Sequence, residues 1–258
     1  DSATYFGTLR ADWDVAFGNG TITNIFGYRD LDNSALGDID ATPVDIFHSP
    51  TQLTQQQYSN ELRYAGTFGK MDLTTGVYYF DQDIAYDEVR ELFQFAGAGA
   101  PPTFYGGGKQ DHKVFGAFAN IDYSVTDDLT VTAGLRYSDE EKEAAIVYLQ
   151  PRPECSVVAS TCPFEGVNPF TGAPDGYRDE DSWSNFTPKL GVQYQINDNA
   201  QAYGSYTKGF RSGGYNFRIT NVPVFLASVA ARDNQFSFDE EEVNAFEIGS
   251  KFTSEDRR

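Results

Sequence analysis

The sequence contains no long apolar run: no window approaches the roughly 18–20 continuous apolar residues of a membrane helix. This excludes a helical membrane protein. It leaves a transmembrane β-barrel open, because the strands of a barrel alternate between lipid and water and are polar overall. The mean hydropathy of −0.46 agrees with such alternation.

Positive charge is also scarce, with 19 Lys and Arg against 38 Asp and Glu and a net charge of −19. A nucleic-acid partner is excluded, because its phosphates must be met by Lys and Arg. Two interpretations of the acidity stay open. The carboxylates either keep the surface soluble, or acidic loops meet cationic ligands and the divalent cations that bridge lipopolysaccharide.

Catalytic patterns are missing too. The sequence has no nucleophile elbow, zinc-ligand spacing or phosphate loop. Its carboxylate runs, at 179–181 and 239–242, are more typical of solvated strand edges than of acid–base pairs. We therefore predict that the protein is not an enzyme, with no catalytic residues, no metal site and no cofactor.

Aromatic residues, in contrast, are abundant at 15% of the chain. Two aromatic girdles at the membrane interfaces would require such an excess. Along 129–137, apolar residues at odd positions alternate with polar or small ones at even positions, which indicates a strand between two different solvents. The same alternation predicts that one set of aromatics faces lipid: Trp13, Tyr64, Tyr79, Tyr137, Tyr194 and Phe246.

Nine such strands follow one another, with short turns alternating strictly with long connections. A soluble β-sandwich has no reason to gather its long loops at one end, whereas outer-membrane barrels have short periplasmic turns and long extracellular loops. We predict an all-β fold, a next-neighbour antiparallel meander forming part of a larger transmembrane β-barrel. The expected short turns lie near Gly18, Gly69, Asp127 and Asp198, and the expected long loops cover 30–55, 87–110, 149–181 and 213–238.

The run Y-T-K-G-F-R-S-G-G-Y-N at 206–216 resembles a signature of TonB-dependent outer-membrane receptors, and 128–137 is also similar to that family. The resemblance implies a barrel of 22 strands around an N-terminal plug. It also implies energised uptake of a scarce ligand into a Gram-negative cell, most often a ferric siderophore. The implied partners are outer-membrane lipid and lipopolysaccharide, the plug, TonB and an extracellular ligand such as a metal chelate.

The chain boundaries predict an internal fragment. Residues 1–4 carry no signal peptide, and the chain stops at 255–258 just after a strand pattern. An open sheet with an unpaired strand at each end is unstable in lipid. We therefore expect residues 1–258 to be part of a receptor barrel, without the plug and the C-terminal strands.

Two rival functions stay open. A substrate-specific porin shares the strand pattern and the lopsided loops but needs no plug. Residues upstream of Asp1 would discriminate between the two, because a globular plug of roughly 120–150 residues there favours the receptor. A surface β-domain that binds glycans is favoured only if the protein is soluble without detergent.

Three kinds of candidate site residue can be named. Cys155 and Cys162 lie in a loop assigned to the cell exterior, which predicts a disulfide there. Lys208 and Arg211 lie where the signature strand enters its loop, and we predict that they are cationic ligand contacts. Arginines on the polar strand faces either meet an acidic plug or anionic ligand, or are solvated lumen charges: Arg10, Arg29, Arg63, Arg136 and Arg211.

Overall fold

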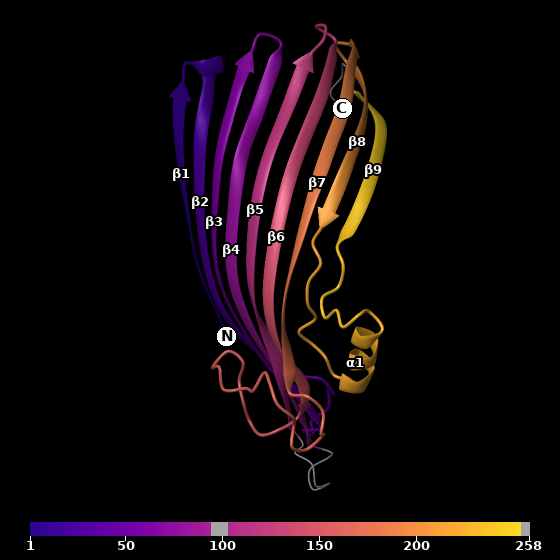
Figure 1. Ribbon diagram of the computed structural model, residues 1–258. Helices are drawn as coiled ribbons and strands as arrows, with labels where there is room; N and C mark the ends of the chain where they lie inside the picture. The colour runs from indigo at the N-terminus through magenta and orange to yellow at the C-terminus, as the bar shows by residue number, and fades with distance from the viewer. Residues whose placement is uncertain (94–102, 254–258) are drawn as a thin grey trace.

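The computed structural model describes residues 1–93 and 103–253. These residues form one antiparallel sheet in which every strand pairs with its neighbours in the sequence, in the order β1 to β9 (Figure 1). The predicted meander is confirmed, and the sheet is not closed into a barrel. Its strands are β1 (Ser2–Val15), β2 (Gly20–Asp38), β3 (Phe47–Phe68), β4 (Met71–Leu92), β5 (Thr103–Ser124), β6 (Leu129–Pro151), β7 (Gly176–Asn197), β8 (Ala200–Arg211) and β9 (Glu241–Phe252).

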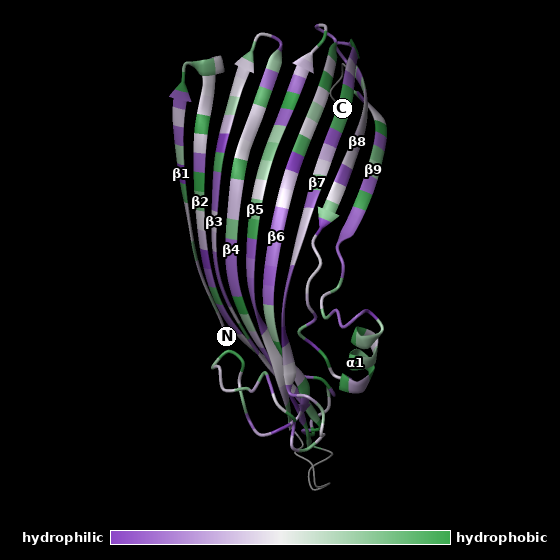
Figure 2. Cartoon of the chain, in the orientation of Figure 1, coloured by the Kyte–Doolittle hydropathy of each residue, from purple (hydrophilic) through white to green (hydrophobic). Residues whose placement is uncertain are grey.

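The pairing register gives the sheet two chemically different faces. Opposite residues of paired strands point to the same side, so Leu135 of β6 shares a face with its partner Ala119 of β5. Arg136 shares the other face with Phe118. Bands of opposite hydropathy accordingly alternate along the strands (Figure 2). We call the side of Leu135 the apolar face and the side of Arg136 the polar face.

Aromatic side chains mark the end of the apolar band toward the long loops. Tyr28 and Tyr58 lie with ring centroids 5.1 Å apart, and Tyr137 and Phe186 lie 4.9 Å apart. Each belongs to the apolar face, and polar residues follow beyond it. An aromatic girdle at this height is typical of an outer-membrane barrel. We call the set the outer aromatic row: Tyr28, Tyr58, Tyr79, Phe115, Tyr137, Phe186, Tyr206 and Phe246.

Two of the predicted long loops are wrong. Most of 30–55 belongs to β2 and β3, which stay paired as far as Asp38 and His48, so the connection covers only 39–46. Most of the described part of 87–110 likewise belongs to β4 and β5; 94–102 lie outside the described residues. Beyond the membrane both faces of a hairpin meet water. The apolar alternation then ends while the backbone hydrogen bonds continue.

The other two long connections are confirmed as long. In 152–175, Val157 and Cys162 pack on the apolar-face side of β6, whereas Ala173 packs with 212–240 against the cluster on its polar face. The connection 212–240 contains the helix α1 (Val222–Ala230), which lies within the predicted loop 213–238. Within the described residues, no helix has the length and hydrophobicity to cross a membrane.

A single carboxylate organises the connection 39–46. Asp40 accepts hydrogen bonds from the backbone N–H groups of Thr42, Ile46 and Phe47 and from the Thr42 hydroxyl. These bonds stabilise the charged form and lower the pKa of Asp40 to about 2.

The lowered pKa predicts how acid affects this connection. The stabilisation by the Asp40 carboxylate is fully present above the ordinary aspartate pKa of about 3.9 and is lost as the pH falls through about 2. An NMR titration of the Asp40 carboxyl carbon in the full-length protein should give its midpoint near the lower value. A midpoint at the ordinary aspartate pKa would show that these hydrogen bonds do not stabilise the charged form of Asp40.

Candidate functional site

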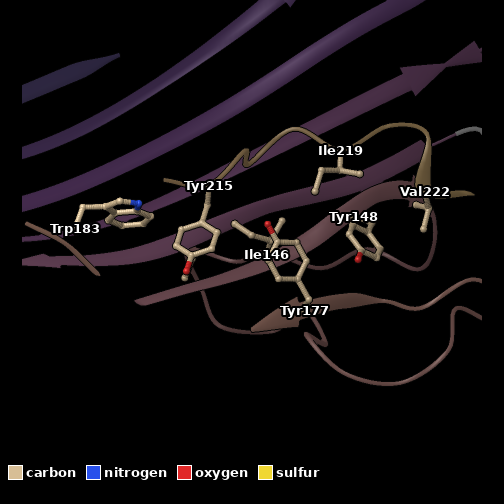
Figure 3. Close-up of a cluster of buried hydrophobic side chains, with 8 residues drawn as sticks. Ile146, Tyr148, Tyr177, Trp183, Tyr215, Ile219 and Val222 are labelled. Carbon is tan, nitrogen blue, oxygen red and sulfur yellow. The ribbon is translucent and has the colours of Figure 1, made fainter. Parts of the chain in front are cut away.

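The segment 212–240 covers the polar face at the outer end of β6 and β7. Ile146 and Tyr148 of β6 are 0% and 1% exposed beneath it, and Tyr177 of β7 is 7% exposed. The side chains come from both the strands and the segment (Figure 3). In a barrel the apolar face turns to the hydrocarbon and the polar face lines the lumen. The segment therefore folds inward along the lumen wall.

Polar side chains fix the beginning of this segment. The Nζ atom of Lys142, on β6, donates to Ser212 Oγ at 2.7 Å and to the carbonyl oxygen of Gly213. Ser212 Oγ donates in turn to Glu140 Oε2 at 2.6 Å, and His112 Nε2 lies 3.0 Å from the same oxygen. The signature residues Ser212 and Gly213 are thus bound to β6, and Glu140 also contacts His112 of β5.

Two further tethers reach other strands. Glu88 of β4 is only 2% exposed, and its Oε1 lies 2.9 Å from Arg218 Nη2 of the segment and 3.0 Å from Arg90 Nε. Ser237 Oγ donates to Asp181 Oδ2 on β7 at 2.6 Å. Because an ion pair to the buried Glu88 and several hydrogen bonds join it to β4, β6 and β7, the segment is a fixed part of the wall.

The structure places the two predicted ligand contacts on opposite faces. Arg211 lies on the polar face, is 75% exposed and has Nη1 3.6 Å from Glu241 Oε2. Lys208 shares a face with Tyr206 of the outer aromatic row, and its Nζ lies 2.7 Å from Glu242 Oε1. The register does not bring them together, and ligand contact by either residue stays a prediction.

The arginines predicted to lie on the polar face share that face by register. Several have local partners. Arg10 Nε lies 2.8 Å from Asp12 Oδ2, and the Arg136 guanidinium lies 5.8 Å from the ring centroid of Tyr78. These contacts show that part of the lumen charge is paired within the sheet itself.

The connection 152–175 carries the cysteines, and the structure joins Cys155 to Cys162 as a disulfide. Val157 and Cys162 pack on Val147 of β6, on the side of the sheet away from 212–240. Asp87 of β4 accepts hydrogen bonds from Ser156 and from backbone N–H groups of the same turn. Across the described residues, no group of three or more His, Cys, Asp and Glu side chains is placed to hold a metal ion.

Comparison with known families identifies the family to which this chain belongs. The family model described as "TonB dependent receptor-like, beta-barrel" matches residues 1–257. The chain belongs to the TonB-dependent receptor family. Its signature run 206–216 begins in β8 and continues into the segment 212–240.

Solved TonB-dependent receptors have the same fold at low sequence identity. The ferric yersiniabactin uptake receptor FyuA from Yersinia pestis has a TM-score of 0.72 and 14% identity, over 98% of this chain and 34% of its own. The siderophore receptor PiuA from Acinetobacter baumannii gives 0.67 and 14%, over 99% and 38%. The ferric-catecholate import receptor Fiu from E. coli K12, in its open form, gives 0.64 and 16%, over 100% and 39%. The chain thus spans little more than a third of their length.

The tether residues of this receptor wall were missed by sequence reasoning. His112 belongs to no sequence motif, yet it lies in β5 beside Glu140. Lys142 and Ser212 are 70 residues apart in sequence. No local pattern joins residues so distant, so only the pairing of β6, β7 and β8 reveals the contact.

The signature glycines give a direct test of the tether. A Cβ on Gly213 would lie 2.0 Å from the carbonyl oxygen of Phe238 and 2.6 Å from the Trp183 ring, whereas the nearest atom to a Cβ on Gly214 would be 3.2 Å away. We expect Gly213→Ala to detach 212–240 and raise its amide hydrogen exchange at least tenfold, which corresponds to about 1.4 kcal/mol. Gly214→Ala is the matched control, with little change. Equal exchange in the two variants would contradict this account.

Proposed function

We propose that this chain is part of the barrel of an outer-membrane receptor that takes up a scarce ligand with energy delivered through TonB. The family match over residues 1–257 carries the proposal. The two faces of the sheet support it, since an apolar face suits lipid and a polar face suits a lumen. The proposed location is the outer membrane of a Gram-negative bacterium.

The proposal extends to partners. Lipid and lipopolysaccharide would contact the apolar face, and a plug domain of the whole receptor would contact the polar face. TonB would act on that plug. The extracellular ligand would enter from the end where the connections 39–46, 152–175 and 212–240 lie, because the long loops of such barrels face the cell exterior.

Ferric siderophores are the first ligand class to test. The structures with this fold include receptors named for ferric yersiniabactin, for siderophores and for ferric catecholates. The low identities show a shared fold alone, so a ferric siderophore is proposed as the class and no single compound is chosen.

Uptake in cells tests the proposal. The full-length gene is expressed in iron-limited cells that lack their own siderophore receptors, and accumulation of a panel of ⁵⁵Fe-siderophores is measured with and without a functional TonB system. We expect uptake of at least one member that falls to the background of cells without the gene when TonB is removed. Uptake that does not change on removal of TonB would support a porin and contradict the receptor.

A further inference from the structure

The polar face of β2 to β5 carries a patch of amide and aromatic side chains outside the outer aromatic row. The register sets Gln57 of β3 opposite Gln82 of β4, and Gln82 opposite His112 of β5. One step further from the membrane, Gln55 and Gln110 flank Ile84 in the same manner. We call this set the lumenal amide patch: Gln55, Gln57, Gln82, Gln110, Phe80 and Tyr86.

The opposite face at the same height is very different. On each of β2 to β5 we compare the first three positions beyond the outer aromatic row on one face with the first three on the other. This gives twelve positions on each face. On the lumenal side the only Asp, Glu, Lys or Arg among them is Arg29. On the other side seven of the twelve are charged, namely Asp30, Asp32, Asp81, Asp83, Lys109, Asp111 and Lys113.

Folding does not require this difference. Both faces lie beyond the apolar band, where water would solvate charged side chains on either side, and the chain as a whole carries a net charge of −19. Binding gives a reason. An uncharged ligand needs hydrogen-bonding groups and apolar surface, and amide and aromatic side chains supply both without adding net charge to the site.

The patch has the groups that such a ligand needs. Gln55 Nε2 donates to Gln57 Oε1 at 2.9 Å, and Gln82 Nε2 lies 3.5 Å from the same oxygen. Since an amide has two N–H donors and an oxygen with two lone pairs, these bonds leave further donors and acceptors at each residue. Phe80 and Tyr86 lie on the same strand and face as Gln82, so aromatic surface is next to the amides.

We propose that the lumenal amide patch binds an uncharged ligand surface rich in hydroxyl and carbonyl groups. Both a saccharide and a neutral ferric chelate present that chemistry. The proposal rests on the proposed function, because it takes the lumen to be the path of the ligand. It adds the chemical class of ligand that the outer wall accepts.

The test compares one charge change on the two faces of β3. Gln55 lies opposite Leu31 and Ile84, so Gln55→Glu places a carboxylate in the patch with no cation opposite it. Gln56→Glu makes the same change one residue away on the other face. Binding to the purified full-length receptor in detergent is measured by calorimetry with four probes: maltoheptaose, a neutral ferric trihydroxamate, an anionic ferric tricatecholate and a sulfated maltoheptaose.

We expect an uncharged probe to bind and its affinity to fall at least tenfold in Gln55→Glu, while Gln56→Glu stays within twofold of the wild type. Binding of maltoheptaose identifies a saccharide, and binding of the trihydroxamate identifies a chelate. The proposal is overturned if only anionic probes bind, if no uncharged probe binds, or if the two variants behave alike. Binding is measured without TonB, so the result stands apart from the uptake test.

Discussion

Replacing Leu190 with arginine is expected to destabilise the folded receptor in lipid by about 2–4 kcal/mol, the cost of a cation on the lipid face at mid-membrane. Leu190 pairs with Ala133, in the middle of an apolar stretch that ends in Phe186 on one side and Tyr194 on the other. It is 54% exposed in the sheet. That exposed surface would meet hydrocarbon, which cannot solvate a guanidinium.

The matched control lies on the same strand. Gln193→Arg adds the same side chain to the polar face, where Gln193 pairs with Thr130 and Tyr203. We expect a change within about 0.5 kcal/mol, as for an ordinary surface substitution. The free energy of unfolding of both full-length variants is measured in urea from lipid vesicles. An equal loss of stability in the two variants would contradict the claim that the two faces of the sheet meet different solvents.

Asp175→Ala is expected to have the second large effect, about 3–5 kcal/mol, by leaving a buried charge without its partner. Arg152 is 2% exposed, and its Nη1 lies 3.2 Å from Asp175 Oδ1. Burial lowers the pKa of Arg152 and opposes its charged form, while the carboxylate of Asp175 acts in the other direction. The pair closes the connection 152–175 at its two ends.

An exposed pair in the same part of the chain is the control. Arg178 Nε lies 3.6 Å from Glu165 Oε1, with side chains 47% and 83% exposed, so Glu165→Ala should cost no more than about 1 kcal/mol. The double change Arg152→Met and Asp175→Leu should recover much of the loss, because no buried charge remains. Limited proteolysis and urea unfolding report both effects. If Asp175→Ala lowers the stability as little as Glu165→Ala does, the buried pair of Arg152 and Asp175 does not hold this connection in place.

The strands could be predicted because the membrane imposes a pattern on them. Leu129 to Tyr137 alternate in sequence because lipid and lumen impose different chemistry on successive residues. The same alternation predicts which aromatics share the apolar face, and the register agrees for Tyr137 and Phe246. The short turns needed only residues such as Gly18 and Gly69, both of which have positive φ.

Beyond the membrane this alternation ends, and there the sequence no longer predicts the strands correctly. Asp30 and Gln56 are polar on the same face as Tyr28, yet they are paired within β2 and β3. A hairpin with water on both sides can carry almost any polar sequence. Its strands therefore cannot be distinguished from a loop by alternation.

The arrangement of the site required the fold. Alternation already places Lys208 and Arg211 on opposite faces of one strand, as the register confirms. In contrast, the contact between Lys142 and Ser212 depends on the register of three strands and on the inward fold of 212–240. Such contacts between distant residues leave no local signal in the sequence.

Site-directed spin labelling along β6 tests the central claim most directly, that this sheet is a wall between lipid and lumen. Single cysteines are placed in turn from 129 to 137 in the full-length receptor, with the native cysteine pair replaced by serine, and the protein is reconstituted in lipid. We predict that collisions with oxygen, which concentrates in hydrocarbon, peak at 129, 131, 133, 135 and 137. Collisions that do not alternate, or a water-soluble reagent that reaches odd and even positions equally, would contradict the account.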